Sequence, residues 1–151
     1  MNKILENKYV HLISRILIGL VFVIFGASKI DDTLGFAKDI SNYDILPFFL
    51  VNATAIILPW IELVAGILLI CGVKIRANAL LITAMLIVFN LAIIIAMARG
   101  LNIDCGCYAT IAEQKVGWQK LIENFGLIAL LTMIFFKTNY NFTLETDNIN
   151  D

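Results

Sequence analysis

The chain has 151 residues, of which 60% are hydrophobic and only 15% are charged, and its formal net charge is −1. This composition leaves too little polar surface for a water-soluble domain, and the near-neutral charge gives no support for nucleic acid binding or for a polybasic lipid-binding arm. Apolar runs that approach the ~20 residues needed to cross a bilayer occur four times. We therefore predict an all-α polytopic membrane protein, with a four-transmembrane-helix bundle over residues 12–136.

The polar segments 1–11 and 137–151 flank this bundle, and the second of them is predicted to be disordered. The first span is predicted over 12–30, with Arg15 in its first turn, where a long side chain can reach the lipid headgroups. Steps of four and three residues define one face of this span. The members of that face are Arg15, Gly19, Phe22, Gly26 and Lys29. The glycines allow a neighbouring helix to approach closely, whereas Lys29 needs a polar partner.

An acidic loop follows over 31–46, and a short amphipathic helix is predicted within it, over 36–43. The second span is predicted over 49–71. Pro59 inside it is expected to kink the helix or to start a new helical segment. Glu62 comes next, and a carboxyl group inside a span is costly unless it is partnered or protonated, so it marks a functional site by default. The alternative for Glu62 is a buried ion pair that fixes the register of two helices.

The third span, predicted over 77–98, carries Asn90 as its one strongly polar residue. An asparagine in a span more often hydrogen-bonds to a neighbouring helix than takes part in chemistry. The fourth span is predicted over 121–136, with Glu123 and Asn124 near its start in the headgroup zone.

The connection between the third and fourth spans contains Asp104-Cys105-Gly106-Cys107-Tyr108. Thiols spaced Cys-x-Cys can close a small-ring disulfide where the backbone bends sharply, and Gly106 allows such a bend. A small ring is strained, and strained disulfides are the ones that exchange readily. The spacing therefore favours redox chemistry at Cys105 and Cys107. Half of a metal site and two unpaired thiols are the alternatives; no metal is predicted, because a tetrahedral zinc site needs more ligands than this connection offers.

Basic residues decide the predicted orientation. Lys74 and Arg76 lie in the short loop between the second and third spans, and short basic loops stay in the cytoplasm. Both termini are therefore placed in the cytoplasm and the cysteine turn outside a cell (inner) membrane, where disulfides persist. Cys71 falls at the opposite face, about 30 Å from the turn and out of disulfide range, and is predicted to be an inert packing residue.

Depth along the helices links three polar residues. At 1.5 Å rise per residue, Asn90 lies roughly 12 Å inside the outer end of its span, and Glu62 roughly 15 Å or less. Lys29 closes the first span at the same end. We hypothesise one polar cluster of Lys29, Glu62 and Asn90 beneath the cysteine turn, with Lys29 as the charge partner of Glu62.

Several motifs now stand in a fixed order along the chain. They are Arg15-x3-Gly19-x2-Phe22-x3-Gly26-x2-Lys29, Tyr43-x-x-Leu46-Pro47, Pro59-x-x-Glu62-x3-Gly66 and Cys105-Gly106-Cys107. This ordered set resembles the MauE/DoxX family over nearly the whole chain, from Arg15 to about Phe136. The Cys-x-Cys element points to the MauE side, which is named for methylamine utilisation. A phenylalanine often follows the second cysteine in such relatives, and Tyr108 stands there in this chain.

The MauE resemblance implies an accessory membrane protein that works beside a thioredoxin-like periplasmic partner in disulfide formation. The DoxX side implies a link to quinone and to sulfur-compound oxidation. On this basis, Cys105 and Cys107 would exchange with a partner's thiols, Glu62 would take or give a proton, and quinone is a candidate electron acceptor. The supporting polar residues would be Lys29, Asn90 and Arg15.

A non-enzymatic assembly or scaffold component is the alternative function, with the cysteines in a structural role. A small transporter that uses the Glu62 cluster as its pathway is a third option. Whether the two thiols change oxidation state discriminates the first function from the other two.

Overall fold

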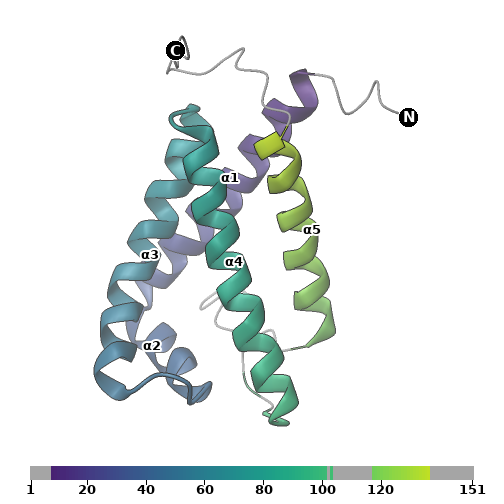
Figure 1. Cartoon of the computed structure of the whole chain (residues 1–151). Helices are drawn as coiled ribbons and strands as arrows, with labels where there is room; N and C mark the ends of the chain where they lie inside the picture. Colours follow the sequence, from purple (N-terminus) through teal and green to yellow (C-terminus); the bar gives the residue numbers. More distant parts are fainter. Residues whose placement is uncertain (1–7, 102, 104–116, 137–151) are drawn as a thin grey trace, which may run out of the picture.

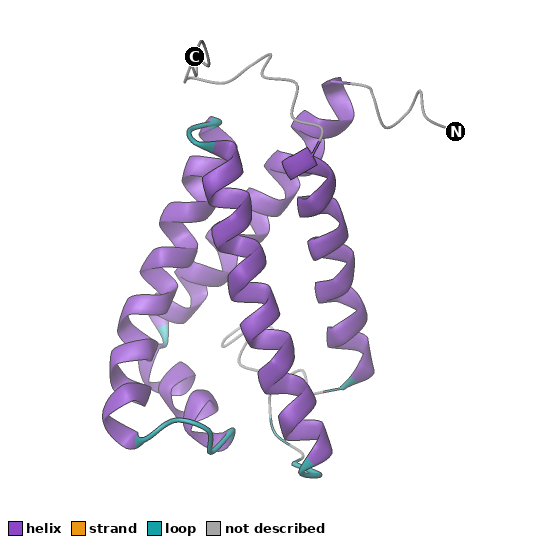
Figure 2. Cartoon of the chain, viewed as in Figure 1, coloured by secondary structure: helices purple, strands orange, loops and turns teal. Residues whose placement is uncertain are grey.

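The computed structural model describes residues 8–101, 103 and 117–136, and every regular element in this part is a helix (Figures 1 and 2). The helices are α1 (Lys8–Asp31), α2 (Thr33–Asn42), α3 (Phe48–Cys71), α4 (Ile75–Ala98) and α5 (Trp118–Phe136). Four of them, all except α2, are long and apolar enough to cross a membrane. The predicted all-α, four-span architecture is therefore confirmed, and the short helix predicted in the acidic loop is α2.

The four long helices alternate in direction, and α2 lies across one end of the bundle (Figure 1). α1 packs most extensively on α3, α4 packs on both α3 and α5, and α5 has a smaller contact with α1. α2 packs mainly on α3. The end that carries α2 is called the α2 end below. It receives the end of α1 and of α4 and the start of α3 and of α5 (Figure 1).

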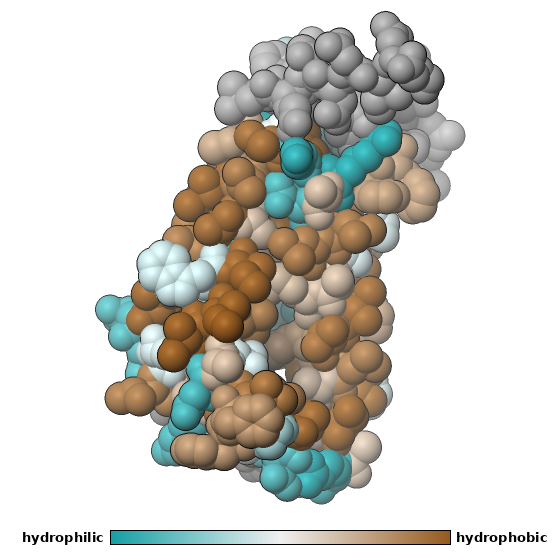
Figure 3. Space-filling model, turned by 60° about the vertical axis from the view of Figure 1, so that its left-hand side comes forward, coloured by the Kyte–Doolittle hydropathy of each residue, from teal (hydrophilic) through white to brown (hydrophobic). Residues whose placement is uncertain are grey.

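The outer surface of the bundle is apolar. Large aliphatic and aromatic side chains are exposed along all four long helices, among them Leu17, Ile57, Val88 and Phe125. Figure 3 shows such side chains covering most of one face, with hydrophilic ones gathered mainly toward its two ends. In water this surface would drive aggregation, but in a bilayer it faces lipid chains, so the surface agrees with a membrane location.

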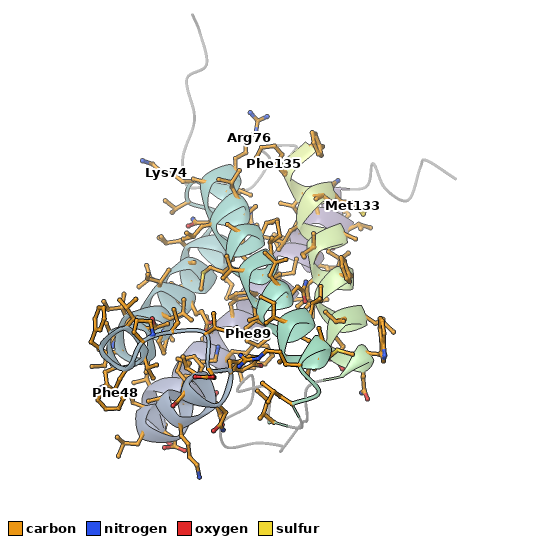
Figure 4. All side chains as sticks on the ribbon, turned by 60° about the horizontal axis from the view of Figure 1, so that its bottom comes forward. Phe48, Lys74, Arg76, Phe89, Met133 and Phe135 are labelled. Carbon is orange, nitrogen blue, oxygen red and sulfur yellow. The ribbon has the colours of Figure 1, made fainter. Side chains whose placement is uncertain are left out.

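The apolar core occupies the end opposite α2. Its buried members come from all four long helices: Ile18, Phe22, Ala65, Leu69, Ile75, Ala79, Ile82, Leu86, Leu131 and Ile134. The α3–α4 turn closes this end, with Gly72 at φ 77°. Its N–H donates to the Leu69 carbonyl, and the Val73 N–H donates to the Leu68 carbonyl, a pattern that ends a helix with a left-handed residue. Lys74 and Arg76 project from this end of the bundle, away from Phe48 (Figure 4).

The helices extend further than the hydropathy pattern predicted. α1 begins at residue 8 rather than 12, α4 at 75 rather than 77, and α5 at 118 rather than 121, because helical hydrogen bonding continues past the hydrocarbon into polar residues. Pro59 lies inside α3, which is one helix rather than two segments. The ring of Pro59 is fully buried, and such prolines are tolerated in spans where neighbouring helices pack around them.

Candidate functional site

A line of glycines brings α1 and α3 into close contact. A Cβ added at Gly26 would lie 2.8 Å from the Pro59 carbonyl oxygen and 2.9 Å from the Leu63 nitrogen. A Cβ at Gly19 would lie 2.8 Å from the Gly66 carbonyl oxygen. Since these neighbours are backbone atoms, only glycine permits this spacing. The glycine face predicted for the first span is therefore the face that meets α3.

The close approach of the helices lets Lys29 reach Glu62. The Lys29 Nζ donates to both carboxylate oxygens of Glu62 at 2.8 Å. The two side chains are only 6% and 10% exposed. Lys29 belongs to the last turn of α1, and Glu62 lies 14 residues into α3, which is about 21 Å of helix rise. The predicted pairing is observed, but Glu62 lies deeper than the predicted 15 Å, because α3 continues as one helix through Pro59.

The short helix α2 covers this ion pair. The Lys29 Nζ lies 4.8 Å from the centre of the Phe36 ring, a cation–π contact. α2 is held in place by its own N-cap, where the Gly35 N–H donates to Asp32 Oδ1 at 2.9 Å. The Thr33 hydroxyl also donates to the Lys29 and Ile30 carbonyls at 3.3 and 3.0 Å. The charge pair is thus enclosed by α1, α2 and α3.

Asn90 forms a second polar pair, across α4 and α5. The Asn124 Nδ2 donates to Asn90 Oδ1 at 2.9 Å, and both residues are buried. This is the interhelical hydrogen bond favoured for Asn90. The predicted single cluster is therefore two pairs, one between α1 and α3 and one between α4 and α5: in the part of the chain that is described, Asn90 hydrogen-bonds to Asn124 rather than to Lys29 or Glu62.

Arg15 lies near the other end of α1, away from both polar pairs. α1 starts four residues earlier than predicted, so Arg15 is in the second turn, and the residue is 8% exposed rather than extended to the headgroups. Its Nη2 lies 3.5 Å from the Ile70 carbonyl oxygen, at the end of α3. This contact ties the two antiparallel helices together at the end opposite α2.

The family model described as "Methylamine utilisation protein MauE" matches residues 7–137. That range includes all five helices. The chain belongs to the MauE family. The resemblance predicted from the ordered motifs is thus confirmed on its MauE side.

A curated relative is the "Methylamine utilization protein MauE" of Paracoccus denitrificans, which is 31% identical over 121 residues. The match covers 80% of this chain but 65% of that protein, so this MauE-family chain spans about two thirds of the length of its relative. No solved structure matches.

In this MauE-family chain, Cys105 and Cys107 lie outside the described residues. The end of α4, from which this connection starts, is described. Arg99 is the C-cap residue that follows the last helical residue of α4, and Gly100 comes next at φ 69°. The Arg99 guanidinium donates to the Tyr43 and Asp44 carbonyls at 3.0 and 3.2 Å and to Asp44 Oδ2 at 3.1 Å. The loop between α2 and α3 is thereby tied to the end of α4 from which the cysteine connection departs.

Cys71 is separate from this region. It is the last residue of α3, at the end opposite α2, as predicted. Its side chain is exposed on the surface of the bundle, so the interpretation of Cys71 as a packing residue is wrong. A position at the end of a helix leaves its thiol without neighbours that would enclose it.

Three residues of the site were missed from the sequence. Asn124 was predicted in the headgroup zone, but α5 begins at Trp118 and carries it inward. Lys120 is also buried, with its Nζ 2.7 Å from Glu123 Oε2. The step from Lys120 to Asn124 continues to Leu131 on one helical face, which is the signal that could have revealed both. Phe36 carried no signal, because its contact with Lys29 depends on how α2 folds back.

Proposed function

We propose that this MauE-family membrane protein is a thiol–disulfide exchange component whose Cys105 and Cys107 react with a thioredoxin-fold partner outside the cytoplasm. One observation carries the proposal: two thiols one glycine apart stand on the connection between α4 and α5, at the end of the bundle that α2 covers. A buried acid–base pair, Lys29 and Glu62, lies between that end and the middle of the bundle. A connection that carries two thiols and joins helices at the same end of the bundle as a buried carboxyl group suits coupled electron and proton transfer.

The thiol–disulfide exchange takes two steps, in which each S–S bond that breaks is replaced by a new one. A thiolate of the partner attacks one sulfur of the Cys105–Cys107 disulfide, whose S–S bond breaks as a mixed disulfide forms. The partner's second thiol then displaces the chain's sulfur, so the partner is oxidised and Cys105 and Cys107 are left as thiols. Two electrons and two protons have moved to the chain.

Reoxidation of the two thiols needs an acceptor, and a lipid-soluble quinone would supply a two-electron, two-proton one. The described residues fit such a group in one respect, since the buried Asn90 Nδ2 has no hydrogen-bond partner among them. Glu62 would take or give a proton in this step. The Lys29 Nζ donates to both oxygens of this carboxyl group and so holds it in one orientation.

The process in which the protein acts is proposed from its relatives. The matched family and the Paracoccus protein are both named for methylamine utilisation. We place this chain in the same process, as an accessory that maintains the disulfides of a partner protein. Because the chain spans 65% of the relative's length, its partner is to be identified directly rather than carried over.

Trapping identifies the partner. In Cys105→Ser or Cys107→Ser the remaining thiolate can attack the disulfide of an oxidised partner, and the chain then lacks the second thiol that would release the partner. One of the two variants is therefore expected to accumulate a mixed disulfide with a thioredoxin-fold protein, seen as a reducible band on a non-reducing gel. The double variant Cys105→Ser/Cys107→Ser is the matched control. If neither single variant, expressed at wild-type level, traps a protein, the exchange proposal is wrong.

Thiol labelling tests the side of the membrane. With both termini in the cytoplasm, a membrane-impermeant maleimide added to intact cells is expected to label Cys105 and Cys107 only after reduction. Cys71, at the opposite end of the bundle, is the internal control and is expected to label only after the membrane is opened. Labelling of Cys71 alone in intact cells would invert the orientation.

A non-enzymatic assembly component is the second candidate. It is favoured by the fact that both polar pairs, Lys29–Glu62 and Asn90–Asn124, also join neighbouring helices, as a passive scaffold requires. In that case the labelling of Cys105 and Cys107 would not change with the cell's supply of oxidant.

A further inference from the structure

Of the two polar atoms of the Asn90 side-chain amide, the oxygen forms a hydrogen bond and the nitrogen does not. Two facing asparagines can exchange two hydrogen bonds, but here one is made, from Asn124 Nδ2 to Asn90 Oδ1. The Asn90 Nδ2 is buried and has no partner among the described residues. Asn90 as a whole is 5% exposed. A buried N–H donor without an acceptor costs free energy, so a donor of this kind indicates a missing acceptor.

The place of this donor suits a lipid-soluble molecule. Asn90 lies on the inward stripe of α4, between the buried Leu86 and Ile93. By helix rise it is about 12 Å from the end of α4, which is within hydrocarbon depth. An acceptor that reaches it must therefore be soluble in the hydrocarbon region of the bilayer.

Near Asn90, α5 contributes few residues to the apolar core. α5 packs mainly on α4 and less on α1. In its first half, the buried residues are Lys120, Leu121 and Asn124, while its contribution to the apolar core comes from the far half, through Leu131 and Ile134. A flat molecule that comes from the lipid has to part α4 and α5 locally to reach the buried Asn90 Nδ2, but it need not displace the core residues in the far half of the bundle.

We propose that Asn90 Nδ2 donates a hydrogen bond to a carbonyl oxygen of a quinone head group held beside α4 and α5. The inference rests on the proposed function, in which a quinone accepts the electrons, and it assigns a residue to hold that group. An oxidised quinone ring carries carbonyl oxygens that accept hydrogen bonds and no N–H or O–H donors on those carbonyls. It therefore complements a spare donor in an apolar surround, and Asn124 orients the Asn90 amide by occupying its oxygen.

The variants are chosen to keep the bundle folded. Asn90→Leu alone would leave the Asn124 amide without its partner, whereas Asn90→Leu/Asn124→Leu replaces both amides with apolar groups of similar size, which is close to neutral for stability. Thr83→Val is the matched control, because Thr83 also lies on α4 and its hydroxyl bonds only to the Ala79 carbonyl of the same helix.

The experiment measures binding of decylubiquinone to the purified full chain in nanodiscs, without any thiol assay. Two readouts are used: the dissociation constant from tryptophan quenching, and the infrared stretch of an isotope-labelled quinone carbonyl, which falls when the carbonyl accepts a hydrogen bond. The double variant is expected to bind about tenfold more weakly or worse, the worth of one buried hydrogen bond, and to lose the infrared shift. Thr83→Val is expected to match the wild type, and thermal melting checks that all three are folded.

Two other results would contradict the assignment of Asn90. If the wild type binds quinone and the folded double variant binds it equally well with the same carbonyl stretch, the assignment of Asn90 is overturned while the proposed function stands. If the wild type does not bind quinone, both the assignment of Asn90 and the quinone step are overturned. The exchange with a partner is then judged by the trapping experiment alone.

Discussion

Replacing Lys29 with methionine is expected to destabilise the bundle by about 3–5 kcal/mol, the usual cost of removing one partner of a buried ion pair. The reason is that Glu62 would keep its carboxyl group at 10% side-chain exposure without the ammonium that both its oxygens now accept from. The measurement is the midpoint of thermal unfolding in detergent, which should fall by roughly 10 °C, together with the membrane yield.

The double variant Lys29→Met/Glu62→Met is the control for this prediction. It removes both charges at once, and apolar side chains of similar volume often replace a buried pair without loss of stability. We therefore expect it to recover most of the melting temperature. Full stability of Lys29→Met, with normal yield, would contradict the pairing as a stabilising element.

The same pair of variants separates the structural from the chemical reading of Glu62. Suppose that the double variant is stable and still oxidises the reduced partner, once trapping has identified it, at the wild-type rate. The ion pair then serves only to fix the register of α1 and α3. If that variant is stable but fails to turn over, Glu62 acts in proton transfer. Turnover must be compared between proteins of equal stability, because unfolding alone would lower the turnover as well as the melting temperature.

Changing Gly26→Val is expected to have the second large effect. A Cβ there would lie 2.8 Å from the Pro59 carbonyl oxygen and 2.9 Å from the Leu63 nitrogen. Because these are backbone atoms of α3, the two helices must separate, and we expect a loss of about 3 kcal/mol or more. The separation would also draw Lys29 away from Glu62, so size-exclusion and thermal melting should show a poorly folded, aggregating protein.

Gly126→Ala provides the matched control on α5. A Cβ added at Gly126 meets nothing within 4 Å, and alanine is the better helix former. We expect this variant to be as stable as the wild type or slightly more stable. If Gly26→Val behaved like Gly126→Ala, then the close approach of α1 and α3 would not be what holds the site together.

The sequence by itself determined the architecture of this protein. Long apolar runs specify the four spans, because a bilayer requires about 20 apolar residues per helix whatever the rest of the chain does. The steps of four and three between Arg15 and Lys29 specify which face of α1 meets a neighbour, because helical periodicity is local. The same face predicted the charge pair, since Lys29 at the α2 end needs an acid and Glu62 is the acid within reach.

Only the tertiary structure decided how the polar residues combine. Asn90 pairs with Asn124 on α5 rather than with Glu62. Helix tilt and the start of α5 determine which side chains meet, and the local periodicity of the sequence predicts neither. Phe36 covers Lys29 because α2 folds back beneath α1 and α3, which depends on the corner at Asp32. Local sequence sets each helix and its face; the distances between faces come from packing that involves the whole bundle.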